Sequence, residues 1–285
     1  MELKKSGEIK SIACQKLSLC WAECVSILLI ELGIAVVFVL TMLLMTKFCY
    51  TFGIIDFDID HVVSQGTLPF FISVVIAVGI MLFFSAPLSY GVNWFYMQAV
   101  LGRKAPASSF FACYTNKELF KKVLRLHGMV SFRKFLMFVP LCLLIIAELI
   151  FTELVLKKTE DSFIYSVIVC CFILISAGAF FVYILATMRY SLVKFIYALD
   201  NEKSPELIIK ESAECIAGNE SYILEIFLSV GLWIASCILI FPGVYAAPYI
   251  KMISAVTAKT LIEYNSDLWT EKKRTSPVKE EHTFV

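Results

Sequence analysis

Five charged side chains lie inside stretches of sequence that are otherwise apolar, and a sixth lies where such a stretch ends. A charged group at the centre of a bilayer costs about 2.5–3.5 kcal/mol or more, so such groups mark functional sites or paired contacts. The five internal charges are Glu31, Glu148, Glu225, Lys251 and Lys259, and the boundary charge is Arg189. We interpret them as structural ion pairs or as a pathway for a proton or an ion.

Counting residues from the predicted ends of the membrane segments, at about 1.5 Å per residue, gives each charge a depth. Three acid–base pairs match in depth, and they would hold the sixth membrane segment between the first and the third. The predicted pairs are Glu31 with Lys259, Glu148 with Lys251, and Glu225 with Arg189. Three interpretations of these charges are open. The pairs only neutralise charge, or Glu31 and Glu148 belong to a pathway for a proton or an ion, or the side chains are unpaired and reach toward water.

The stretches around these charges are long enough to cross a bilayer. Hydrophobic residues make up 59% of the chain and charged residues 17%, against about 45–50% and about 25% in soluble domains. Residues 62–102 contain no charged side chain over 41 positions, and a spanning helix needs about 20 residues. We therefore predict an all-α, polytopic transmembrane helical bundle with six spans, at residues 25–46, 68–102, 132–156, 162–188, 222–241 and 244–264.

Charge distribution orients these spans. A turn at Pro242-Gly243 separates the fifth from the sixth, and the alternative is one span over residues 226–250 followed by an aqueous helix. With six spans, 20 of the 25 Lys and Arg residues share one side, which the positive-inside rule makes the cytoplasm. We predict cytoplasmic termini, one transmembrane domain over residues 1–264, and a polar, disordered tail over residues 265–285.

A weak internal sequence repeat predicts a structural unit that occurs three times and consists of an interfacial helix followed by a helical hairpin. In the third unit, Ser204 is placed to cap a helix, with Pro205 at its first position and Glu206 favouring its N-terminal dipole. In the second, residues 117–127 form a basic amphipathic helix suited to anionic lipid at the inner leaflet. Its basic residues are Lys117, Lys121, Lys122 and Arg125.

Polar and aromatic side chains crowd the predicted inner end of the second span. Asn93 and Gln98 flank the run Trp94, Phe95, Tyr96. An aromatic belt at the membrane interface explains this pattern, and also the boundary positions of Trp21, Tyr50, Tyr90 and Tyr249. The alternative is a substrate vestibule at this end of the span.

The chain shows no pattern typical of a catalytic or metal centre. Residues 56–61 resemble the start of a calcium loop but lack its glycine and distal glutamate. Zinc, phosphate-loop and nucleophile-elbow patterns are absent, and the ten cysteines contain no CxxC and are interpreted as small buried hydrophobes. We expect no enzymatic activity, no cofactor and no bound metal, and the net charge of +1 does not indicate nucleic acid.

Several short motifs follow one another in the last third of the chain. They are Arg189-Tyr190-Ser191-Leu192-Val193, Ser204-Pro205, Gly231-Leu232-Trp233, Pro242-Gly243 and Ala247-Pro248-Tyr249. With these motifs, this part of the chain resembles an uncharacterised family of bacterial integral membrane proteins. That family is similar to the membrane domain attached to some glycerophosphodiester phosphodiesterases. The resemblance implies a six-helix fold in a bacterial plasma membrane, without diesterase activity because the catalytic domain is missing here.

These observations favour a multi-pass membrane protein that binds or transports a lipid or another amphiphile. The alternative is a structural or regulatory subunit that docks a partner protein or anionic lipid through its basic interfacial helices. The lipid bilayer is the expected partner, and the sequence leaves a protein partner or a homo-oligomer open.

Overall fold

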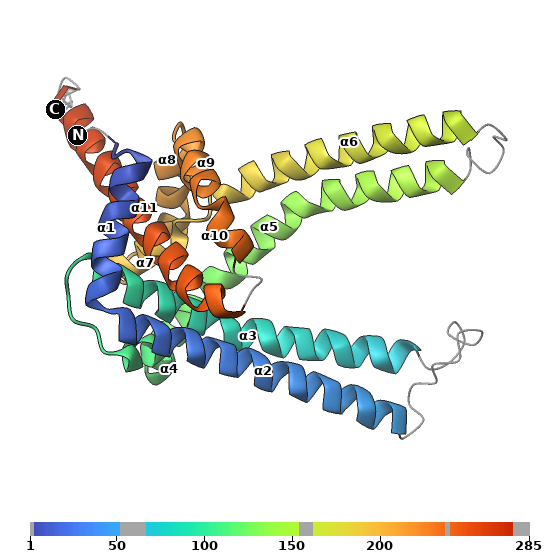
Figure 1. Cartoon of the computed structure of the whole chain (residues 1–285), viewed down its shortest axis with the longest axis horizontal. Helices are drawn as coiled ribbons and strands as arrows, with labels where there is room; N and C mark the ends of the chain where they lie inside the picture. The colour runs from blue at the N-terminus through green and yellow to red at the C-terminus, as the bar shows by residue number, and fades with distance from the viewer. Residues whose placement is uncertain (1–2, 52–66, 154–161, 237–239, 276–285) are drawn as a thin grey trace, which may run out of the picture. The chain divides into compact units, whose positions relative to one another are not determined.

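The computed structural model describes residues 3–51, 67–153, 162–236 and 240–275, and every regular element in them is a helix (Figure 1). The chain forms two compact units. One contains Lys4–Leu124 and Phe227–Thr260; the other contains Met1–Leu3, Arg125–Ile226 and Leu261–Val285. The helical prediction is confirmed for the described residues, while the aspartates of the calcium-like sequence at 56–61 lie outside them.

The first unit is built around a helical hairpin. Helix α1 (Ser6–Leu19) is followed, after a break at Cys20, by α2 (Trp21–Thr51), and α2 lies beside α3 (Thr67–Val100). The break occurs because the Cys20 backbone leaves helical geometry, with φ −134° and ψ 30°. Helix α3 continues through Pro87, as predicted for the second span.

A close backbone approach fixes the short helices that follow α3. Helix η1 (Ala107–Phe111) and helix α4 (Ala112–Thr115) both pack on α3. At Gly91 of α3, an added Cβ would lie 1.9 Å from the carbonyl oxygen of Phe110. Only glycine fits there, because any side chain would collide with the backbone of η1.

The second unit combines another hairpin with a set of short helices. Helix α5 (Lys117–Phe151), whose first residues belong to the first unit, lies beside α6 (Ser162–Met188). The ring pairs Phe138–Tyr183 and Phe151–Phe172, 5.5 Å apart between centroids in each case, show that these helices are antiparallel. The bounds of α6 match the predicted fourth span, and α5 contains most of the third.

Helices α7 (Val193–Leu199) and α8 (Pro205–Ile216) form the core beyond this hairpin. Phe195 and Ile196 of α7 and Ile208 and Ile209 of α8 are buried. The predicted N-terminus of α8 is confirmed: the Leu207 backbone N–H donates to Ser204 Oγ at 3.4 Å, and Pro205 begins the helix.

The predicted fifth span is not one helix. Its described residues fall mainly in α9 (Glu220–Ser229), α10 (Gly231–Ser236) and the first residues of α11 (Ile240–Thr275). Helix α9 has 10 residues, a length of about 15 Å, which is too short to cross a bilayer of about 30 Å. The predicted turn at Pro242-Gly243 is also wrong, because both residues lie in the first turn of α11, where proline is tolerated.

Two further boundaries differ from the prediction. The predicted polar tail begins too early, because α11 continues to Thr275; residues 276–285 lie outside the described part. The predicted amphipathic helix at 117–127 is not separate from the third span, since α5 runs unbroken from Lys117 to Phe151. No proline or local cap interrupts it before Pro140, and that proline is accommodated within the helix.

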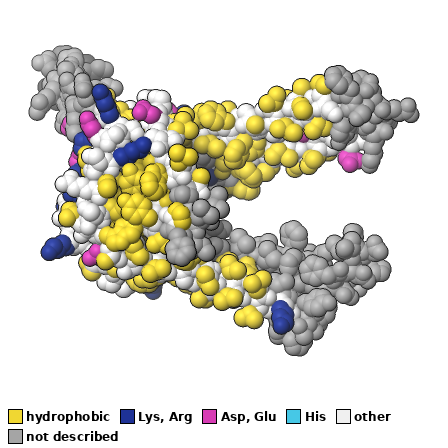
Figure 2. All heavy atoms as spheres, viewed as in Figure 1, with side chains coloured by type: hydrophobic (Ala, Val, Ile, Leu, Met, Phe, Trp, Pro, Cys, Tyr) yellow, Lys and Arg dark blue, Asp and Glu magenta, His cyan; other side chains and the backbone are white. Residues whose placement is uncertain are grey.

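Three helical segments among the described residues are long and apolar enough to cross a membrane: Trp21–Leu44, Lys117–Phe151 and Ser166–Leu199. Many of their apolar side chains lie exposed on the surface of the protein. Figure 2 shows this hydrophobic surface along α5 and α6. Monomeric soluble proteins rarely expose apolar patches larger than a few hundred Å². These three segments therefore indicate a membrane protein.

Candidate functional site

An ion pair joins two of the six charges that the sequence singled out. Lys251 Nζ of α11 donates to Glu31 Oε2 of α2, and both side chains are only partly exposed. Glu31 lies ten residues after Trp21, about 15 Å along α2. The pair therefore lies well inside a candidate membrane span.

This pairing corrects the one predicted from depth. Glu31 pairs with Lys251 rather than Lys259. Counting residues failed because α11 begins at Ile240, earlier than the predicted sixth span. A residue count also assumes helices of equal tilt, and a lysine side chain reaches across several ångströms.

The predicted partner of Lys251, Glu148, has a different contact. Ser176 Oγ of α6 donates to Glu148 Oε2 at 2.5 Å, which links the two helices of the second hairpin. The other carboxylate oxygen, Oε1, is buried without a hydrogen-bond partner among the described residues. A short polar bridge thus takes the place of the predicted ion pair.

The third predicted pair is wrong. Arg189 and Glu225 are both exposed, and within the described ranges no ion pair joins them. The Arg189 backbone carbonyl instead accepts a hydrogen bond from Ser212 Oγ at 2.8 Å. Both charges are exposed, so neither needs a charged partner.

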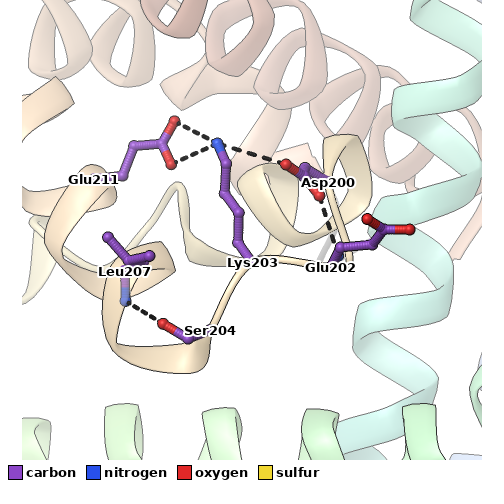
Figure 3. Close-up of polar contacts among 6 residues, drawn as sticks. All are labelled: Asp200, Glu202, Lys203, Ser204, Leu207 and Glu211. Atoms are coloured by element: carbon purple, nitrogen blue, oxygen red, sulfur yellow. Dashed lines mark hydrogen bonds and ion pairs between the residues drawn. The ribbon is translucent and has the colours of Figure 1, made fainter.

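A polar cluster at the start of α8 was not predicted (Figure 3). Lys203 Nζ donates to both carboxylate oxygens of Glu211, at 3.1 and 2.9 Å, and lies 3.9 Å from Asp200 Oδ2. The Glu202 backbone N–H donates to Asp200 Oδ1 at 3.0 Å. The cluster shapes the turn between α7 and α8.

A pocket of about 380 Å³ lies beside this cluster, between α8 and α11. Its two lysines are both paired with acids, since Lys210 lies 3.8 Å from Glu214 and Lys203 bonds Glu211. Burial, and then the nearby Glu211 and Glu214, raises the pKa of the Cys215 thiol to about 11. This pocket is therefore balanced in charge, and its cysteine is protonated at neutral pH.

A larger pocket, of about 680 Å³, lies where α1 meets α2 and α3 ends. We call it the boundary pocket because Trp21, the first residue of a candidate membrane span, directly follows the Cys20 in its wall. Its lining combines basic, apolar and small residues. They are Lys16, Leu19, Cys20, Glu23, Phe95, Ala99, Gly102, Arg103, Lys104, Ala105 and Pro106.

The C-terminus of α3 builds one wall of the boundary pocket. The Gly102 N–H donates to the Ala99 carbonyl at 3.1 Å and the Arg103 N–H to the Gln98 carbonyl at 3.0 Å. Gly102 has φ 77°, so these bonds form a Schellman motif with glycine in the left-handed position. The motif turns the chain sharply and places Arg103 and Lys104 beside the helix end.

Side-chain contacts hold two of the pocket's cations. Arg103 Nη1 donates to Oε1 of the buried Gln98 at 3.4 Å. A Cβ added at Gly102 would lie 3.6 Å from Lys16 Nζ, so the lysine covers this glycine. Of the residues in the vestibule interpretation, Phe95 lines the boundary pocket, whereas Gln98 is buried behind it and holds Arg103.

The boundary pocket also contains a thiol with a neighbour. Cys20 Sγ lies 3.7 Å from Cys24 Sγ, one turn further along the chain. The hydrogen bond between them lowers the pKa of the Cys20 thiol below its usual value. The spacing of one helical turn brings these two sulfurs together, and the interpretation as a buried hydrophobe fits Cys24, which is buried, better than Cys20, which is partly exposed.

Aromatic rings gather near the same membrane boundary. Trp21 and Tyr245 have centroids 5.1 Å apart, and Trp233 lies 5.8 Å from Tyr245 and 5.5 Å from Tyr249. The side chains of Trp233 and Tyr245 are exposed, whereas that of Tyr249 is buried. The aromatic-belt interpretation stays a prediction for Trp21, and it does not fit Tyr90 and Tyr249, whose side chains are buried within the protein.

Comparison of the chain with protein-family models, with curated proteins and with solved structures finds no match. The function proposed below is therefore argued from the geometry of the chain.

Proposed function

We propose that the protein is a multi-pass membrane protein that binds a lipid or another amphiphile at the inner edge of the bilayer, without catalysing a reaction. The observation that carries this proposal is the lining of the boundary pocket, which combines three basic residues with Leu19, Phe95 and Ala99. An amphiphile presents a polar group joined to an apolar chain, so it matches both parts of the lining. Binding of this kind is also the first step of a transport-type function.

The surroundings of the pocket support this proposal. Leu19 is 77% exposed at its rim, and further along α2 the side chains of Leu29, Leu32 and Leu43 are exposed. An acyl chain could leave the pocket along this surface without meeting water. The polar group would stay where the basic residues lie.

Photo-cross-linking tests the proposal. The protein is reconstituted in nanodiscs that contain a phospholipid with a photoactivatable group near its glycerol, and the labelled peptides are identified by mass spectrometry. We expect adducts within residues 16–23 or 95–106. Ala99→Trp, which fills the pocket, should abolish them, while Ala177→Trp on the exposed surface of α6 should not. Adducts confined to α5 and α6 would contradict the proposal.

The finer topology is part of the proposal: three hairpins, up to six crossings, in the plasma membrane with both termini cytoplasmic. Helices α2, α3, α5 and α6 form two hairpins, and the proposed third hairpin would lie in the part of the chain that contains α9, α10 and α11. Four or six crossings place the C-terminus on the side of the N-terminus, whereas five do not. A reporter fused after Val285 should read as cytoplasmic, and an external reading would exclude this topology.

A second candidate function is docking of a partner protein or anionic lipid by the basic start of α5. Lys117, Lys121 and Arg125 are exposed there, whereas Val123 and Leu126 are buried. Under this function, changing the three basic residues to glutamine would remove anionic lipid enrichment around the protein in mixed nanodiscs. Under the first function, the same variant would keep the boundary-pocket adducts.

A further inference from the structure

We propose that the boundary pocket recognises a phosphate group, as carried by an anionic phospholipid headgroup, through Lys16, Arg103 and Lys104. This inference rests on the amphiphile-binding function proposed above and names the chemical class of the polar group. It follows from the charge balance of the pocket and from the way its cations are held.

Within the described part of the chain, the cations of the boundary pocket form no ion pair with an acid. Glu23, which is exposed, is the one acid in the lining, so three cations and one acid leave a formal charge of +2. Among the described residues, no ion pair joins Glu23 to Lys16, Arg103 or Lys104. The pocket beside α8 differs, because there Lys203 and Lys210 are each paired with a glutamate. The boundary pocket therefore has positive charge left for a ligand.

The backbone and Gln98 direct Arg103 for this role. The Schellman motif fixes the Arg103 backbone, and the bond to Gln98 uses one of the five N–H groups of its guanidinium. The remaining N–H groups form the planar fork that suits two phosphate oxygens. Lys16, on a different helix, supplies a second charge, because its Nζ lies over Gly102, next to Arg103.

Cations near the end of α3 also complement the negative end of its dipole. That structural role does not account for the whole set, since the Schellman motif already satisfies the carbonyls of Gln98 and Ala99. It also does not explain the apolar lining beside the cations. Basic pockets at the cytoplasmic ends of membrane helices are typical of sites for anionic lipid headgroups.

A binding experiment with soluble short-chain lipids tests the inference. Dihexanoyl phosphatidic acid, dihexanoyl phosphatidylcholine and inorganic phosphate are titrated separately into the full-length protein in a neutral detergent, and dissociation constants are measured by calorimetry. We expect the phosphatidic acid to bind at least about tenfold more tightly than the phosphatidylcholine, because each basic residue near an anionic group contributes about fivefold.

The variants isolate the three cations. Lys16→Gln, Arg103→Gln and Lys104→Gln together should weaken phosphatidic acid binding by more than about tenfold. The matched control changes one arginine and two lysines that are outside the pocket, Arg133→Gln, Lys5→Gln and Lys210→Gln, and should change it less than twofold. Should the triple variant not fold, Lys104→Gln alone, at an exposed position, should give about a fivefold loss.

The outcomes separate this inference from the proposed function. Equal affinity for both lipids would overturn the selection of an anionic phosphate headgroup, because phosphatidylcholine carries a phosphate but no net charge, and it would leave amphiphile binding intact. Equal effects of the pocket and control variants would overturn the assignment of the headgroup site to Lys16, Arg103 and Lys104. Failure of both lipids to bind would overturn the amphiphile function and the inference with it. Inorganic phosphate binding as tightly as the lipid would support the phosphate site and overturn the amphiphile function.

Discussion

At the scale of single residues, the chemistry of this protein depends on which charges meet inside the apolar helices. Glu31 and Lys251 form an ion pair between α2 and α11, while Glu148 shares a hydrogen bond with Ser176. The sequence identified Glu31, Glu148 and Lys251 as unusual but assigned them other partners. Because removing one member of a desolvated pair leaves a charge without compensation, the actual pairing is testable.

We expect Lys251→Met alone to lower the free energy of unfolding by about 1–3 kcal/mol, and Glu31→Leu to restore most of that loss in the double variant. The half-exposed side chains place the effect below that of a fully buried pair. Thermal unfolding in detergent measures the three variants. The control combines Glu31→Leu with Lys259→Met instead. The pairing predicted from depth expects Glu31→Leu to rescue Lys259→Met, whereas the structure pairs Glu31 with Lys251 and predicts no rescue.

The two characterised thiols should differ in reactivity. Because its pKa is raised to about 11, about one Cys215 thiol in a thousand is ionised at pH 8, whereas the pKa of Cys20 is lowered. N-ethylmaleimide at pH 7.5, followed by peptide mass spectrometry, should label Cys20 first. Labelling of Cys215 should rise only as the pH approaches 11. Equal rates in the folded protein at pH 7.5 would contradict the assignment, and equal rates after denaturation are the control.

At the scale of elements, short connections decide where the helices end. The break at Cys20, the Schellman motif at Gly102 and the cap at Ser204 separate interfacial helices from their neighbours. Helix α5 has no such device between Lys117 and its apolar part, so it continues. The three predicted units are therefore not copies of one another, even though their apolar patterns are similar.

Gly91→Ala should destabilise the first unit by about 1–3 kcal/mol, because the added methyl group would collide with the Phe110 carbonyl and force α3 and η1 apart. Gly79→Ala is the matched control on the same helix, where an added Cβ has no neighbour within 4 Å. It should be neutral or stabilising by up to about 1 kcal/mol. Thermal unfolding of both variants checks this, and an equal loss in the two would contradict the close approach.

At the scale of the whole molecule, exposed leucines have two different environments. Leu143 of α5 is 61% exposed within a candidate span, and Leu207 of α8 is 56% exposed outside the candidate spans. The exposed fractions are similar, so only the surrounding solvent separates them. A lipid environment makes the first position intolerant of charge.

Leu143→Arg should therefore cost about 2.5–3.5 kcal/mol of insertion free energy and reduce the amount of protein in the membrane. Leu207→Arg should be tolerated, because its side chain meets water or the headgroup region. Quantitative immunoblotting of membrane fractions compares the two variants. Similar losses would mean that the second hairpin is not surrounded by lipid.

Much of the helical content was predictable from the sequence, because apolar length and the absence of charge are local properties. The bounds of α6 and the N-terminus of α8 were predicted correctly, since a continuous apolar run and a Ser-Pro-Glu cap need no distant partner. The interruption at Val230 and the early start of α11 were not predicted. The clearest turn signal in this part of the sequence is Pro242-Gly243, and the structure has no turn there.

The sequence by itself determined that the chain belongs in a bilayer, which charges are costly there, and that the inner end of the second span was a candidate vestibule. Only the tertiary structure decided that Lys251 meets Glu31 and that Lys16, Arg103 and Lys104 line one pocket. The physical reason is that hydrophobic length acts on each helix alone. Partners and pockets instead depend on helix crossings, on backbone turns such as that at Gly102, and on the reach of long side chains, which residue spacing does not encode.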